Sequence, residues 1–169
     1  VDWTNSATGG SGTATGTTSW SIASIALNAG NNMITVRAWN VASHMGVDMI
    51  TIVRDNVAPT CTIATPAADP YYANGSTISL SGTASDNSIV ATVTWMNAAT
   101  GTSGTASGTN NWNIPVLSLN PGSNLICVNA SDAAGNNGTD SIVVIRENVS
   151  CTITSPTSAP TYFTNWGWI

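Results

Sequence analysis

The chain has 169 residues, of which only 7% are charged, and its formal net charge is −5 at pH 7. Three basic residues cannot neutralise a run of phosphates, which excludes nucleic acid as a partner. No apolar stretch approaches the roughly 20 residues of a membrane span, and no signal peptide is visible, which indicates a processed chain or a fragment.

An internal repeat organises the sequence. Residues 1–57 and 93–149 align at a constant offset of 92, and 28 of the 57 positions are identical. A second match, at an offset of 90, links Cys61-Thr-Ile63 with Cys151-Thr-Ile153. A fixed period of this kind is typical of tandem domains. It predicts a partial unit at residues 1–58, a complete unit at 59–149 and the opening segment of a third unit at 150–169.

The pattern within each unit predicts strands and no helix, because apolar and polar residues alternate and turn formers recur about every 8–12 positions. In chain order, the strands expected in the complete unit are 61–65, 77–84, 89–96, 103–106, 112–117, 124–130 and 141–146. Seven strands of this kind fit two packed antiparallel sheets.

The alternation also predicts which side chains face the core. The third expected strand would place Ile89, Val93 and Trp95 on one face, with Trp95 as the central core aromatic and Trp3 in the same role in the first unit. Trp20 and Trp112 hold matching places in the two units, and we expect both in the core.

Two segments resemble a known family. The run Asn124-Leu-Ile-Cys-Val-Asn-Ala-Ser-Asp-Ala-Ala-Gly-Asn136 and the linker Arg54-Asp-Asn-Val-Ala-Pro-Thr60 are similar to the tandem Ig-like repeats of prokaryotic surface and secreted proteins. The resemblance implies an all-β fold of tandem Ig-like sandwiches with about seven antiparallel strands per unit, and an extracellular or cell-surface location. The first unit departs from the pattern at residues 40–44, and the linker at 147–150 lacks the Ala-Pro.

The two ends of the chain are complementary in sequence. The first unit is incomplete, because it lacks counterparts of residues 61–84, whereas 150–169 has the sequence of such an opening segment. We expect the tail of one copy to insert into the first unit of the next, as in donor-strand complementation. A head-to-tail contact between two different surfaces need not close into a ring, so it generates a filament. The alternative is an excerpt from a longer covalent array.

The residues expected at this contact between copies are mostly apolar. On the donor they are Cys151, Ile153, Tyr162, Phe163, Trp166, Trp168 and Ile169, and on the acceptor Val1, Trp3, Ile50 and Ile52. Cys61, Cys127 and Cys151 form an odd set of three cysteines, which act either as packing residues or in a disulfide between copies.

No reaction chemistry is visible. The one histidine, His44, lies in a turn, and the scattered carboxylates form no pair suited to glycoside hydrolysis, so we expect no enzyme. No metal site is assigned. Calcium is the one cofactor considered, for the loop carboxylates Asp55, Asp86, Asp132 and Asp140, against the simpler view that Asp132 caps its own turn.

Four N-x-S/T triplets are candidate glycosylation sites, at Asn74, Asn129, Asn137 and Asn148. The sequence therefore predicts a structural segment or subunit of an extracellular filament or stalk whose main partner is itself. The alternative is an accessory module for adhesion or for binding surface glycans. Its candidate contacts are Trp39, Trp166 and Trp168, which have no counterpart in the repeat.

Overall fold

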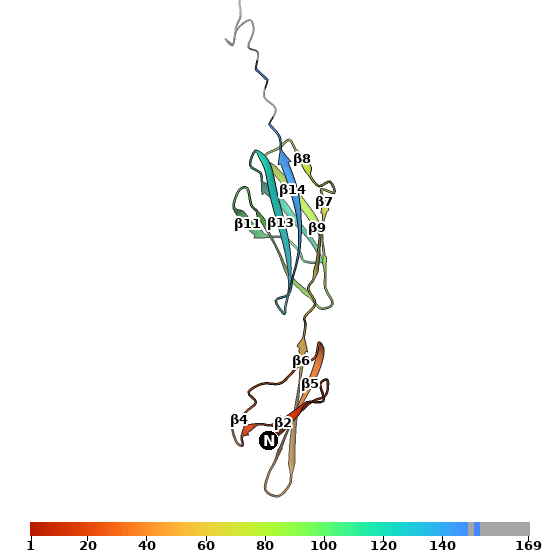
Figure 1. Cartoon of the computed structure of the whole chain (residues 1–169), viewed down its shortest axis with the longest axis vertical. Coiled ribbons are helices and arrows are strands. Elements are labelled where there is room, and N and C mark those ends of the chain that lie inside the picture. Colours follow the sequence, from red (N-terminus) through yellow and green to blue (C-terminus); the bar gives the residue numbers. More distant parts are fainter. Residues whose placement is uncertain (149–150, 153–169) are drawn as a thin grey trace, which may run out of the picture.

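The structure is a computed structural model that describes residues 1–148 and 151–152. Two β-rich units follow one another along the long axis of the molecule, joined by residues 55–59 (Figure 1). The described residues form strands and turns, and none of them belongs to a helix that could span a membrane. The prediction of an all-β fold is confirmed.

The second unit is a sandwich of two sheets. Its strands are β7 (Thr60–Thr65), β8 (Tyr71–Ala73), β9 (Thr77–Ser85), β10 (Val90–Asn97), β11 (Thr102–Thr105), β12 (Asn111–Ser118), β13 (Gly122–Asp132) and β14 (Asn137–Arg146). One sheet has the order β11-β10-β13-β14-β8, and the other has the order β12-β9-β7. All pairs are antiparallel except β14 with β8, which is parallel.

Between the two sheets lies a closed apolar core. Val93, Ile126 and Val128 of the larger sheet are fully buried, and they belong to one cluster with Leu80 and Trp112 of the smaller sheet. Alternate residues of β13 point inward, as expected from the sequence, because successive side chains of a strand face opposite sides of the sheet.

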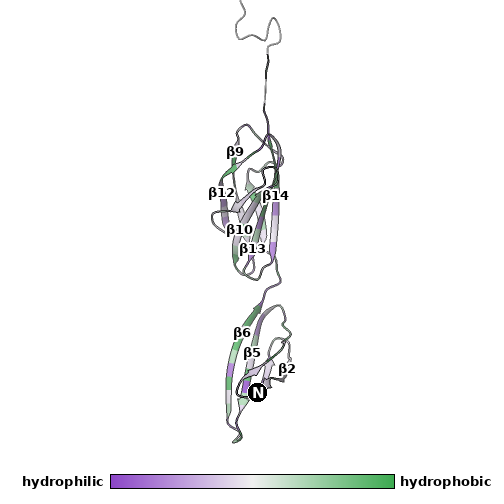
Figure 2. Ribbon diagram, turned by 90° about the vertical axis from the view of Figure 1, so that its left-hand side faces the viewer, coloured by the Kyte–Doolittle hydropathy of each residue, from purple (hydrophilic) through white to green (hydrophobic). Residues whose placement is uncertain are grey.

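The main sheet of the first unit has four strands. Its strands are β1 (Asp2–Asn5), β2 (Ser11–Thr13), β5 (Gly30–Trp39) and β6 (Met45–Arg54), in the order β2-β1-β5-β6, with a small separate pair of β3 (Thr15–Gly16) and β4 (Trp20–Ser21). This sheet repeats the β11-β10-β13-β14 half of the second unit, down to matching pairs such as Trp3 with Gly12 and Trp95 with Gly104. The apolar β6 lies at its edge (Figure 2).

A pair of buried asparagines, which we call the asparagine clasp, fixes the register in each unit. Asn5 Nδ2 donates to Asn32 Oδ1 at 3.1 Å, and Asn97 Nδ2 donates to Asn124 Oδ1 at 3.2 Å. Each second asparagine also donates to backbone carbonyls on its own turn and on the neighbouring strand. Buried amides bonded in this way stabilise one strand register over others, because a shifted register would leave them unpaired.

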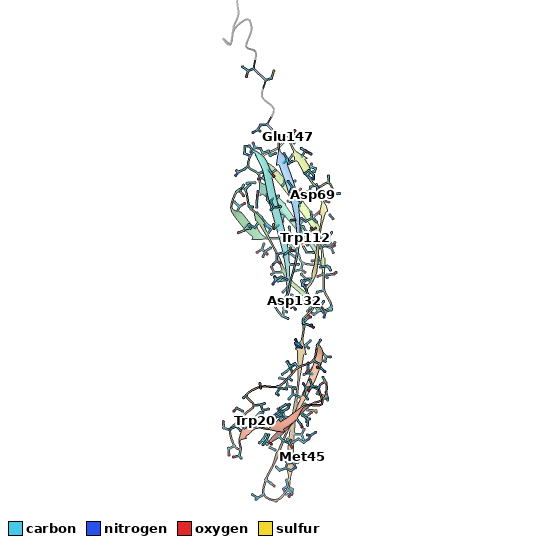
Figure 3. The ribbon with its side chains drawn as sticks, in the orientation of Figure 1. Trp20, Met45, Asp69, Trp112, Asp132 and Glu147 are labelled. Carbon is cyan, nitrogen blue, oxygen red and sulfur yellow. The ribbon has the colours of Figure 1, made fainter. Side chains whose placement is uncertain are left out.

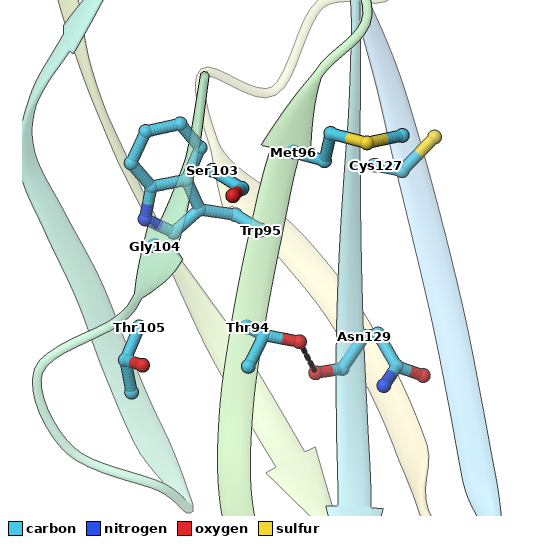
Figure 4. Close-up of a pocket in the computed structure, with 8 residues that line it drawn as sticks. All are labelled: Thr94, Trp95, Met96, Ser103, Gly104, Thr105, Cys127 and Asn129. Carbon is cyan, nitrogen blue, oxygen red and sulfur yellow. Dashed lines mark hydrogen bonds between the residues drawn. The ribbon is translucent and has the colours of Figure 1, made fainter. Parts of the chain in front are cut away.

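Three details differ from the sequence-based expectations. The strand β8 was not predicted. The pairing of β10 with β13 shifts between Val90 and Thr92, so Val90 points inward and Ile89 is 71% exposed. The central buried tryptophan is Trp112, whereas Trp95 is half-buried and lies over Gly104 of the edge strand β11 (Figure 4).

Candidate functional site

The inner face of the first unit is an uncovered copy of a sandwich core. In the second unit, the sheet β12-β9-β7 covers the equivalent face. The first unit has no counterpart of β7 and β9 among the described residues, so the apolar side chains of β6 are left exposed. We call this surface the open face, defined by Val1, Trp20, Ile50 and Ile52, which are half-buried or exposed.

The exposed fractions of corresponding residues in the two units show how far the open face is uncovered. Ile50 is 60% exposed, whereas its counterpart Ile142 is 3% exposed. Trp20 is 45% exposed, whereas Trp112, at the same place in the repeat, is 2% exposed (Figure 3). The sequence-based assignment of Trp20 to the core is therefore wrong for this unit, because β9, which pairs with the strand of Trp112, has no counterpart beside Trp20 among the described residues.

The predicted contact residues fall into two groups. On the acceptor, Ile50 and Ile52 are exposed, and Val1 and Trp3 are half-buried, with the ring of Trp3 over Gly12. On the donor, Cys151 is exposed. The other donor residues, which are Ile153, Tyr162, Phe163, Trp166, Trp168 and Ile169, lie outside the described residues.

A second group of polar side chains lies at the junction between the units. One carboxylate oxygen of each of Asp55, Asp86 and Asp132 lies within 4.8 Å of the other two. Asp132 is 4% exposed and receives hydrogen bonds from the backbone N–H and the side chain of Asn136, at 2.8 and 2.7 Å. The Asn136 side chain is the main cause that lowers the pKa of Asp132 and outweighs its burial.

Asp55 of the linker contributes the remaining feature of this junction. Its Oδ1 accepts the N–H of Val57 at 3.1 Å, while its Oδ2 is buried without a hydrogen bond from the described residues. The nearby Ser88 hydroxyl, whose hydrogen bond goes to Asp86 Oδ2 at 2.7 Å, is the main cause that lowers the pKa of Asp55, followed by the N–H of Val57. Three charged oxygens with one left unpaired match the ligands that Ca²⁺ prefers. These three residues could hold such an ion. Asp140, the fourth loop carboxylate considered, is not part of this group and accepts the backbone N–H of Ile63 at 2.7 Å.

The remaining candidate residues are dispersed. Asn74, Asn137 and Asn148 are exposed, whereas Asn129 is half-buried and donates to Asn137 Oδ1 at 3.1 Å. His44 is exposed, and its backbone N–H donates to Asn40. Cys61 and Cys127 are half-buried free thiols. Burial, followed by the nearby Asp140, raises the pKa of Cys61.

Comparison with known proteins agrees with this architecture. Residues 59–144 match a family model described as a bacterial Ig domain. The solved fibronectin(III)-like modules of CbhA from Clostridium thermocellum are similar at 18% identity and a TM-score of 0.48, over 72% of this chain and 64% of that chain. The chain therefore spans less than two thirds of that structure. No curated protein matches the chain.

Proposed function

Because the chain belongs to the bacterial Ig domain family, we propose that it is a segment of an extracellular structural rod whose copies share strands across their boundaries. Domains of this family are typically carried by extracellular or surface proteins. The proposed role is mechanical and not catalytic. Sheets aligned with the long axis of the molecule would carry load along the rod (Figure 1).

One observation supports the sharing of strands. The open face exposes residues that the same repeat buries in the second unit, and Ile50 and Ile142 are the clearest pair. An apolar sheet with a free edge strand is a template for another strand, because its backbone N–H and C=O groups are unpaired. In the second unit, β8 pairs with the edge of β14, and the sheet of β7 and β9 covers its face. An equivalent incoming segment would pair the edge of β6 and bury its apolar side chains.

The proposed donor is the tail of another copy. Residues 151–153 repeat residues 61–63, which form part of β7, and Tyr162 corresponds to Tyr72 of β8. Burial of each large apolar side chain contributes roughly 1.5–3 kcal/mol. The six apolar tail residues beyond Cys151 together can offset an association cost of about 4–15 kcal/mol. The contact joins two different surfaces, so it extends into a filament.

Deletion of residues 151–169 tests this proposal. The full chain should form particles that lengthen with concentration in negative-stain images and in sedimentation, and the deleted chain should not. Ile50→Asp should also block assembly, because it places a charge on the open face. Ile89→Asp is the matched control, since Ile89 is 71% exposed, against 60% for Ile50, and lies in the second unit, away from that face. Fibres of unchanged length after the deletion would show that the tail is not the donor.

A second candidate function is binding of surface glycans. Trp39 is 48% exposed, pairs with the exposed Met45 and has no counterpart in the second unit. An exposed aromatic ring of this kind can stack on a sugar. Retention of the chain on an insoluble polysaccharide, lost in Trp39→Ala but kept in the Ile50→Asp variant, would favour this function over assembly.

A further inference from the structure

The geometry of the open face points to a docking site that is preorganised for one kind of partner: two strands with the sequence pattern of residues 59–85, from a further copy of the repeat. This inference rests on the proposed sharing of strands and specifies which segment the face accepts. Three residues of the first unit carry it. They are Asp48, Gly46 and Trp20, and each has an identical counterpart in the second unit that already holds such a segment.

Asp48 is a hydrogen-bond acceptor for a backbone N–H of the incoming segment. In the second unit, Asp140 Oδ1 accepts the N–H of Ser141 at 2.8 Å, and Asp140 Oδ2 accepts the N–H of Ile63 of β7 at 2.7 Å. In the first unit, Asp48 Oδ1 accepts the N–H of Met49 at 2.9 Å. The carboxylate is thus held by the same local bond, and its Oδ2 receives no hydrogen bond from the described residues.

Gly46 leaves space for a backbone carbonyl group of the incoming segment. In the second unit, a Cβ atom added to Gly138 would collide with the carbonyl oxygen of the buried Pro59, so only glycine lets the chain enter β7 at this point. A Cβ added to Gly46 would meet nothing within 4 Å. The first unit therefore keeps a glycine where its own described contacts do not require one, and an incoming segment would require it.

Trp20 indicates that the partner contains a second strand with a glycine. In the second unit, Trp112 pairs with Gly82 of β9, and a Cβ at Gly82 would collide with the indole and with the Thr62 carbonyl. Among the described residues, Trp20 pairs only with Gly16 of the short strand β3, and no counterpart of β9 lies beside it. At the offset of 90, residues 151–169 correspond to 61–79, which do not include Gly82, whereas the segment 59–85 includes it.

The three contacts together fix the register of the partner. A slip of one residue moves every side chain to the opposite face of the sheet, which would remove the N–H from Asp48 and place a side chain where the indole of Trp20 needs a glycine. The β6 edge of a second copy supplies one strand, so it lacks the second strand whose glycine would face Trp20.

A covalent fusion tests the inference directly. A copy of residues 59–92 placed before Val1 restores the natural order, because Thr92 precedes Val93, the counterpart of Val1. We expect the fusion to raise the unfolding midpoint of the first unit. With 5-fluorotryptophan labelling, the ¹⁹F resonance of Trp20, assigned by Trp20→Phe, should move to the shift range of the buried Trp112.

Substitutions at the docking site separate recognition from general stability. Gly46→Val should leave the unfused chain unchanged and abolish the gain made by the fusion. Asp48→Ala should reduce that gain by about 10-fold to 100-fold in the folding equilibrium, the usual effect of losing a hydrogen bond to a charged group. Thr51→Val, on the same strand but the opposite face, is the matched control and should change neither chain.

The outcomes distinguish this inference from the proposed function. A Trp20 resonance that stays at its exposed position in the fusion, or a fusion indifferent to Gly46→Val, overturns the docking site even if fibres form. If the fusion buries Trp20 and raises the unfolding midpoint of the first unit while the original chain stays monomeric, the result supports the docking site and rejects assembly through the tail. Self-association unaffected by Gly46→Val would assign the face to a β6 pair between copies and also overturn the inference.

Discussion

Removal of the same three carbon atoms at equivalent positions should cost very different amounts of stability in the two units. Ile142 is 3% exposed, and Ile142→Ala removes about 2.4 kcal/mol of transfer free energy at roughly 0.8 kcal/mol per carbon. The closed core cannot refill the space, so a cavity term raises the expected loss to about 3 kcal/mol. Ile50 is 60% exposed, so Ile50→Ala should cost about 1 kcal/mol, with no closed cavity.

Guanidinium unfolding followed by circular dichroism measures the difference. With a denaturant slope of about 4 kcal/mol per molar for a unit of this size, Ile142→Ala should lower the midpoint of the second unit by about 0.7 M. Ile50→Ala should shift the midpoint of the first unit by about a third of that. The reasoning is refuted if both substitutions cost the same in samples that sediment as monomers, because Ile50 would then be covered in the isolated chain.

Three further predictions concern the second unit and the cysteines. Gly82→Ala should destabilise the second unit by about 1–3 kcal/mol, because the added Cβ would overpack the core against Trp112 and the Thr62 carbonyl. Gly75→Ala, where the atom nearest to the added Cβ is 3.6 Å away, is the control. Equal unfolding midpoints for the two variants would contradict this packing. The pKa of Asp132 is lowered in the folded state, so its stabilising effect is complete above the unfolded pKa of about 3.9 and is lost as the pH falls through the lower folded pKa. Asp132→Asn should therefore reduce the fall of the melting temperature with pH below about pH 4. An unchanged fall would reject this role. If the exposed thiol of Cys151 links copies, non-reducing gels should show ladders that collapse with reductant and disappear in Cys151→Ser, and a ladder kept by that variant would exclude this thiol.

The regular strands of the second unit could be predicted because their patterns are strong. In β13 the residues Ile126, Val128 and Ala130 alternate with exposed or half-buried positions, and all three are fully buried. Repetition added what alternation could not, since the match between residues 1–57 and 93–149 implied that the first unit lacks counterparts of residues 61–84. The three-residue β8 carries too little pattern to be recognised.

Irregular geometry limited the rest. The shift in pairing between Val90 and Thr92 changes which residues point inward, and alternation continued from Val93 back to Ile89 then gives the wrong face. Trp95 lies beside an edge strand, whereas Trp112 lies between the sheets, and strand order is not written in the local sequence. The meeting of Asp55, Asp86 and Asp132 likewise depends on how the linker enters the second unit.

The asparagine clasp has a consequence for a molecule under tension. Asn5 and Asn32 hold β1 and β5 in register in the first unit, where β7 and β9 have no counterpart among the described residues, just as Asn97 and Asn124 do in the second unit beneath both strands. If a pull on a chain of such domains stripped away the covering layer, the remaining sheet would stay correctly aligned. Recovery would then require only that the lost strands dock again, because the register of the remaining sheet is retained. The fibre could therefore stretch and return to its original length.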